Sequence, residues 1–206
     1  MKQYTLIILL VFSVCSSSFA QRSTFPDVLK LQTKVTDITK IEPTVFSDMG
    51  AWHAYALPEA KEDYGSFIGP LLMDLNGRWL ANTMAKLLVS ENGKEINFGD
   101  AKAAIHYFPG MIEQQLEVSG LSIIMRLIFV SDREAMIETR ISTNSKKKRT
   151  LTIAYTGNVL LNASEISSGE KEVKVKFSDN DHLFVIRYPR SIPPVIKVNN
   201  GSYIAT

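Results

Sequence analysis

Short apolar segments separated by two-residue turn signals are the feature that most constrains the fold of this chain. Asn92-Gly93, Pro109-Gly110 and Ser119-Gly120 each divide a pair of segments in which apolar and polar residues alternate. An Asn-Gly pair tolerates positive φ at both positions and is the strongest short signal for a β-hairpin. Alternation with a period of two places every second side chain on the same face of a strand. The pattern therefore predicts consecutive antiparallel strands joined by tight turns.

The same pattern continues over most of the chain beyond residue 80. We expect strands over residues 80–90, 95–98, 103–108, 111–118, 121–130, 135–142, 149–157, 170–177, 182–188 and 195–198, and the start of another at 202–206. No long helical period and no alternation of strands with helices interrupts them. Strands of this length and spacing are typical of an all-β fold, an antiparallel β-sandwich.

Residues 49–70 lack this alternation and are predicted to form a long ordered loop. The segment is rich in aromatic residues, among them Trp52 and Phe67, with His53 beside Trp52. Because loops are usually polar, we expect this one to pack against something. Trp52 offers a flat apolar face that fits a sugar ring and an indole N–H that can donate, and His53 would add a hydrogen-bonding tip. The other interpretation makes Trp52 a packing anchor that closes one end of the sandwich.

Residues 1–20 have the order of a secretory signal peptide. Lys2 gives a basic start, an apolar run occupies residues 4–14, and Ser18 and Ala20 are small residues at the positions that signal peptidase reads. The apolar run is too short to span a bilayer, which needs about 20 residues. We therefore expect an exported protein, periplasmic or extracellular in a Gram-negative-type bacterium.

Cleavage before Gln21 would leave residues 21–206 as a single β-sandwich domain. Cys15 is the only cysteine, so this domain would have no disulfide and no thiol nucleophile. Cys15 also leaves a lipoprotein signal open as an alternative, although the residues before it fit that signal poorly. The chain stops just after a strand-like segment begins at 202–206, which favours an incomplete sandwich, with an edge strand that ends early as the alternative.

The charge balance gives no indication of a nucleic-acid partner. Lysine and arginine exceed aspartate and glutamate by only two, whereas nucleic-acid binding needs a basic surface. The densest basic run, residues 146–149, lies between two strand-like segments and is predicted to be a solvated hairpin loop. Beyond the signal no apolar run is long enough for a membrane span.

No complete catalytic or metal-binding group can be assembled from the sequence. His53, His106 and His182 are too widely spaced for the short-range pairs of a metal site, and no serine lies in a nucleophile elbow. Hydrolysis of a glycoside needs two carboxylates facing each other across a cleft. The carboxylates on predicted strands, such as Glu113 and Glu138, are expected on solvated faces. We therefore predict no catalytic residue, no metal and no cofactor.

Several segments resemble the N-terminal domain of bacterial α-glucosidases of glycoside hydrolase family 63. The most specific is Gly50-Ala51-Trp52-His53 within residues 48–58. The others are residues 65–70, 82–94, 105–110 and 138–144. Their order and spacing hold from about residue 25 to the last residue.

The resemblance implies a large, many-stranded β-sandwich that precedes an (α/α)6 catalytic barrel. Members of the family are inverting exo-α-glucosidases whose general acid and base lie on the barrel, so no catalytic residue carries over to this chain. Trp52, His53 and Phe67 are expected to contact either an α-glucoside oligosaccharide or the barrel. The main hypothesis is a non-catalytic N-terminal domain that helps to wall the active-site cleft. A stand-alone carbohydrate-binding module and an unrelated exported sandwich for adhesion or assembly are the alternatives.

Overall fold

The computed structural model describes residues 26–40, 44–73, 77–143, 145–160, 164–178, 182–189, 191 and 193–206. The predicted signal peptide lies outside this part of the chain. The described residues form four sheets, antiparallel except for the β1–β2 pair, with only two short 3-10 turns, η1 (Lys61–Asp63) and η2 (Phe98–Asp100). The expected all-β class is therefore confirmed. No helix within the described ranges has the length and apolar character needed to cross a membrane.

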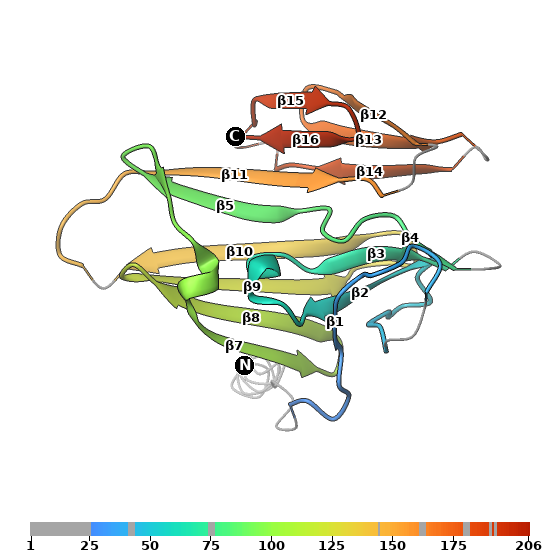
Figure 1. Cartoon of the computed structure of the whole chain (residues 1–206), viewed down its shortest axis with the longest axis horizontal. Helices are drawn as coiled ribbons and strands as arrows, with labels where there is room; N and C mark the ends of the chain where they lie inside the picture. Colours follow the sequence, from blue (N-terminus) through green and yellow to red (C-terminus); the bar gives the residue numbers. More distant parts are fainter. Residues whose placement is uncertain are drawn as a thin grey trace, which may run out of the picture.

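Two sheets form most of the molecule, and in Figure 1 the strands of the first lie side by side below those of the second. The first sheet, entirely antiparallel, has the order β10 (Ala135–Thr143), β9 (Leu121–Phe129), β8 (Met111–Val118), β7 (Lys102–Phe108). The second has the order β15 (Ile196–Asn199), β16 (Ser202–Ala205), β11 (Leu151–Asn158), β5 (Lys86–Glu91), β6 (Lys94–Glu95).

Two smaller sheets complete the fold. One has the order β1 (Gln32–Thr33), β2 (His53–Pro58), β3 (Ile68–Leu72), β4 (Arg78–Trp79), in which β1 and β2 are parallel. The other has the order β12 (Ser164–Ser168), β13 (Glu172–Phe177), β14 (Leu183–Arg187).

The sandwich has more than one core because the five-stranded sheet covers two partners. Leu87 and Val89 of β5 pack with the buried side chains of β8 and β9, such as Leu127, in the main core. Tyr203 of β16 packs with Val175 of β13 in a second core. A third cluster lies in the sheet formed by β1 to β4 and contains the buried Trp79. The layers are thus joined by one sheet that spans two hydrophobic cores.

The predicted turns are confirmed where two residues reverse the chain. Asn92 and Gly93 have φ of 53° and 76°, the left-handed pair that an Asn-Gly hairpin turn requires. Ser119 and Gly120 have φ of 51° and 72° at the turn between β8 and β9. Each turn fixes the register of the strands that it joins, and this register determines which side chains meet across the sheet.

The prediction of a long loop over residues 49–70 is wrong. The segment contains β2, η1 and β3, and all six residues of β2 are buried. A strand that is covered on both faces has no reason to alternate apolar with polar residues. In β3, Gly69 and Pro70 give signals for a break. Burial on both faces therefore removes the alternation of apolar and polar residues that identifies a strand in a sequence.

Two smaller differences have local causes. The strand expected over residues 95–98 ends at Glu95, because the Asn97 side chain accepts a hydrogen bond from the Gly99 N–H at 3.0 Å and starts η2. The basic run at 146–149 is exposed at residues 146–148, but it is not a hairpin loop. It connects β10 of the first sheet to β11 of the second, and these two strands do not pair with each other.

Candidate functional site

An exposed apolar surface lies where β2 begins, and Trp52 is its most exposed member. Met49 and Gly50 both have positive φ, 57° and 70°, in the turn that leads into β2. The Trp52 N–H donates to the carbonyl of Asp132 in the β9–β10 turn at 3.2 Å. The Trp52 carbonyl accepts from the Met73 N–H at 2.9 Å, just after β3. Two other segments of the chain therefore fix the backbone that carries the indole.

We call this the Trp52 surface and define it by four side chains. Trp52 is 69% exposed, and Met49, Met73 and Val130 are each more than two-fifths exposed. Met49 lies in the same turn as Trp52, the Met73 N–H donates to the Trp52 carbonyl, and Val130 is two residues from Asp132. Exposed apolar side chains on segments that meet in this way are more typical of a contact site than of a solvated surface. The interpretation of Trp52 as a packing anchor is wrong, because its side chain projects into solvent. The anchor role belongs to Trp79, which is 1% exposed and donates its indole N–H to the carbonyl of Lys40.

His53 and Phe67 lie in the core and not on this surface. His53 is 8% exposed, and its ring centroid lies 5.2 Å from that of Phe129 and 5.6 Å from that of Tyr55. Burial lowers the pKa of His53, because the protonated imidazole loses its hydration there. Phe67 is 2% exposed and belongs to the main core. Of the three predicted contact residues, the structure places Trp52 alone at the surface.

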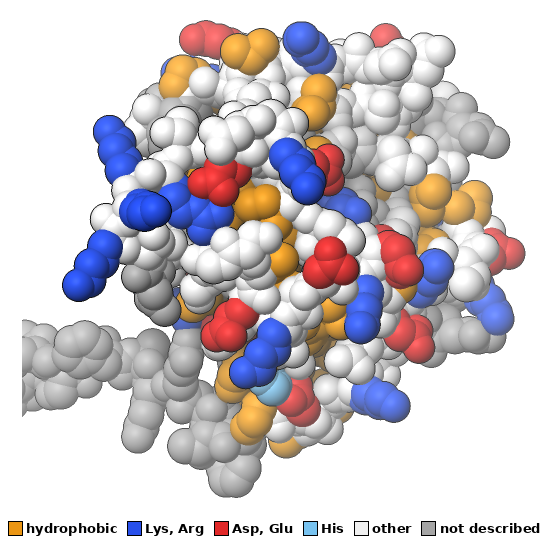
Figure 2. Space-filling view, turned by 60° about the vertical axis from the view of Figure 1, so that its left-hand side comes forward, with side chains coloured by type: hydrophobic (Ala, Val, Ile, Leu, Met, Phe, Trp, Pro, Cys, Tyr) orange, Lys and Arg blue, Asp and Glu red, His pale blue; other side chains and the backbone are white. Residues whose placement is uncertain are grey.

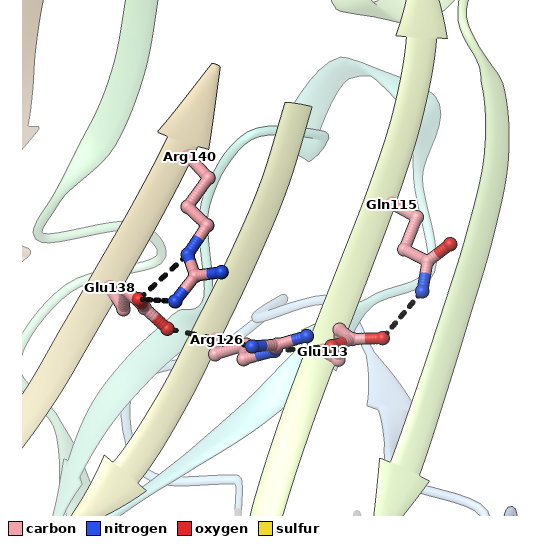
Figure 3. Close-up of polar contacts among 5 residues, drawn as sticks. All are labelled: Glu113, Gln115, Arg126, Glu138 and Arg140. Atoms are coloured by element: carbon pink, nitrogen blue, oxygen red, sulfur yellow. Dashed lines mark hydrogen bonds and ion pairs between the residues drawn. The ribbon is translucent and has the colours of Figure 1, made fainter. Parts of the chain in front are cut away.

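A row of charged side chains crosses the outer face of the first sheet (Figure 3). Register partners place Glu113 of β8 opposite Arg126 of β9, and Arg126 opposite Glu138 of β10. The Arg126 Nε lies 2.5 Å from a Glu113 carboxylate oxygen, and its Nη1 lies 3.6 Å from Glu138. The other Glu113 oxygen accepts from the Gln115 amide at 2.6 Å. Glu138 also pairs with Arg140 at 2.8 Å.

This row corrects the expectation that the strand carboxylates are solvated. Glu113 is fully buried, and a buried carboxylate needs a paired cation or several hydrogen-bond donors. Both requirements are met by Arg126 and Gln115. Counting outward from the turn at Ser119-Gly120 pairs Glu113 with Arg126, so the sequence already contained this signal.

The row does not have the arrangement of a glycosidase acid–base pair. Such a pair needs two carboxylates that face each other across a cleft, one of them free to give up a proton. Glu113 and Glu138 lie on one sheet face, and each is held by an arginine. Within the described part of the chain, no group of three or more His, Cys, Asp or Glu side chains could hold a metal ion. This geometry supports a structural role for the charged row.

Charges on the side of the molecule seen in Figure 2 are mixed in sign, with lysine and arginine side chains interspersed among aspartate and glutamate.

One member of the basic run, Arg149, forms hydrogen bonds with other parts of the fold. Arg149 binds both carboxylate oxygens of Glu91, at 2.9 and 2.8 Å, and donates to the carbonyl of Ser119 at 2.9 Å. The hydrogen bonds from Arg149 lower the pKa of Glu91 although partial burial opposes this. Arg149 therefore links the start of β11 to the end of β5 and to the turn between β8 and β9.

The comparison with known families agrees with the all-β fold. The family model described as "Glucosidase YgjK, N-terminal" matches residues 22–186. The match covers most of the chain, including β1 to β13. It confirms the resemblance to the N-terminal domain of family 63 glucosidases. The chain therefore belongs to the family of the N-terminal domain of glucosidase YgjK.

Proposed function

We propose that this chain is the non-catalytic N-terminal β-sandwich of an exported α-glucosidase, and that its Trp52 surface docks on the (α/α)6 catalytic barrel. Export is supported by the signal-like order of residues 1–20. The docking role is supported by one observation above the others, the exposed apolar surface formed by Met49, Trp52, Met73 and Val130. In the docked state this surface would form part of the wall of the active-site cleft.

Energetic arguments favour Trp52 as the centre of the docked surface. Tryptophan is enriched among the residues whose truncation costs the most binding energy, about 2 kcal/mol or more. Its backbone is fixed by hydrogen bonds to Asp132 and Met73, so little conformational freedom would be lost when a partner covers the indole.

Tryptophan fluorescence offers a direct test because the two tryptophans differ in exposure. Trp79 is buried and Trp52 is exposed, so a blue shift that is present with the unmodified protein and missing with Trp52→Ala reports on Trp52 and not on tryptophans of the partner. We expect this shift when the purified protein is titrated with a separately produced catalytic barrel of a family 63 α-glucosidase. Trp52→Ala should abolish the shift and weaken binding at least about 30-fold, the equivalent of about 2 kcal/mol.

Val195→Ala is the matched control, because Val195 is as exposed as Trp52 but lies beside β15. This variant should bind the barrel as the unmodified protein does. Equal weakening by Val195→Ala, or full binding by Trp52→Ala, would contradict the assignment of the docking surface. Binding can be followed by calorimetry in the variant that lacks the indole.

Hydrolysis of p-nitrophenyl α-glucoside tests the non-catalytic assignment separately. The purified protein alone should give no turnover, since the carboxylates of the charged row are held by arginines. Turnover that disappears in a single carboxylate variant would contradict the proposal.

A stand-alone carbohydrate-binding module is the second candidate. The observation that favours it is the exposed Trp52 ring beside the exposed Asp48 and Asp132, since a flat apolar ring with nearby polar groups suits a sugar. This function predicts the same blue shift with an α-linked glucoside oligosaccharide in the absence of any barrel. A shift with the barrel and none with the oligosaccharide would support docking.

A further inference from the structure

The segment that leads into β1 contacts the free edge of β7 at His106 and Tyr107. We call residues 26–31 the N-terminal strap. The Asp27 N–H donates to the carbonyl of Tyr107 at 2.8 Å, and the Tyr107 N–H donates to the Asp27 carboxylate at 2.8 Å. Because β7 is the last strand of its sheet, these backbone groups of Tyr107 would otherwise lack a strand partner. Asp27 thus satisfies both with a single residue.

A third contact ties the same aspartate to a histidine side chain of β7. The His106 Nδ1 lies 2.7 Å from the second carboxylate oxygen of Asp27. Asp27 also has φ of 57°, which costs most residues energy but is tolerated by aspartate and asparagine. The aspartate therefore adopts an uncommon backbone conformation while making three contacts with β7.

His106 also connects the strap to the charged row on the outer face of the sheet. Its register partner in β8 is Glu113, which is held in turn by Arg126. The titratable groups that face His106 are Asp27 from the strap and Glu113 from β8, while Phe108 supplies an aromatic neighbour at 5.9 Å. The strap thus contacts β7, the strand next to the charged row.

We propose that the N-terminal strap is an acid-released latch, in which the Asp27 carboxylate holds the segment against β7 and its protonation frees the edge of the sheet. An opened edge presents unpaired N–H and C=O groups, which pair readily with a strand of a second copy. The latch therefore keeps β7 from pairing with another chain while the carboxylate is charged.

The direction of the pH dependence follows from the contacts. Burial tends to raise the pKa of Asp27, but the hydrogen bonds to His106 and Tyr107 outweigh it and lower the pKa below 3.8. The folded chain therefore binds this proton less readily than the unfolded chain does. The contribution of Asp27 is complete above pH 3.8 and is lost as the pH falls through the lowered pKa.

Hydrogen exchange at the Tyr107 amide measures the latch directly. In the unmodified protein the protection factor of this amide should be constant from pH 7 to pH 4 and fall below that range. Asp27→Ala should lower the protection about tenfold at pH 7, the effect of losing a hydrogen bond to a charged group. The Met125 amide, in the centre of the same sheet, serves as the reference for global unfolding.

Asp27→Asn separates charge from geometry, because asparagine keeps the amide acceptor for Tyr107 and tolerates positive φ. Its protection at Tyr107 should not change with pH relative to Met125. Asp37→Asn is the matched control, since the Asp37 carboxylate accepts from the N–H and the hydroxyl of Thr39 within its own turn, and it should leave the acid dependence at Tyr107 intact.

Two results would overturn the latch. One is an equal pH dependence at Tyr107 in the unmodified protein and in Asp27→Asn. The other is undiminished protection in Asp27→Ala. Light scattering adds a separate readout, because association at pH 7 should rise in Asp27→Ala and remain unchanged in Asp37→Asn.

Discussion

Glu113 and Gln114 are neighbours in β8, and both are fully buried, yet they lie on opposite faces of the sheet and find their partners in different ways. On the inner face, Gln114 accepts from the Gly65 N–H at 3.2 Å and donates to the Ser66 carbonyl at 2.5 Å. On the outer face, Glu113 is satisfied by the charged Arg126 and by Gln115.

The two faces of this sheet are stabilised in different ways. The inner face is an apolar core, and the buried Gln114 amide fixes the connection between β2 and β3. The outer face is held by side chains that neutralise one another across three strands. Changes on the inner face should therefore act through packing, and changes on the outer face through uncompensated charge.

Leu127→Ala should have the largest effect on stability. Leu127 is fully buried between β8 and β10 in the main core, and truncation of such a leucine leaves a cavity and costs about 3 kcal/mol. Urea denaturation followed by circular dichroism gives the free energy of unfolding. Ile128→Ala is the control, because Ile128 is the next residue on the outer face and is only half-buried. Equal losses for both variants would erase the distinction between the two faces.

Arg126→Met should cost somewhat less, about 2 kcal/mol, because it leaves Glu113 buried without its cation while Gln115 still donates to it. The same denaturation experiment measures the loss. The double variant Glu113→Gln with Arg126→Met removes the uncompensated charge and should recover most of the lost stability. If the double variant is as unstable as Arg126→Met alone, the outer face is held by packing and not by charge.

The sequence predicted the first sheet well, because the alternation of apolar and polar residues and the turn signals indicate the same strands. The segment 111–118 corresponds to β8 to the residue, and the turns at Asn92-Gly93 and Ser119-Gly120 have the required positive φ. Where one face is buried and the other is polar, alternation reports the strand directly. Two-residue turns then fix the register, so the pairing of Glu113 with Arg126 was available from the sequence.

The rest of the fold and most of the site depended on information from distant parts of the chain. β2 is buried on both faces, and β12 has the polar sequence Ser-Glu-Ile-Ser-Ser, so neither alternates in the expected way. The aromatic composition of residues 49–70 does not indicate which rings face solvent. Trp52 and His53 are adjacent residues, and the β9–β10 turn and Phe129 fix their opposite environments.

The smallest expected effect tests whether His53 of β2, which packs on Phe129 of the first sheet, responds to mild acid. Burial lowers the pKa of His53 from 6.5, so below pH 6.5 the unfolded chain binds more protons and stability falls as the pH falls. The slope cannot exceed about 1.4 kcal/mol per pH unit, the value for one proton. His53→Phe should flatten the decline between pH 6.5 and pH 5, where Asp27 and Glu91, with their lowered pKa values, stay charged. His182→Asn, at an exposed position, should retain it, and an unchanged slope in His53→Phe would place the acid sensitivity outside the core.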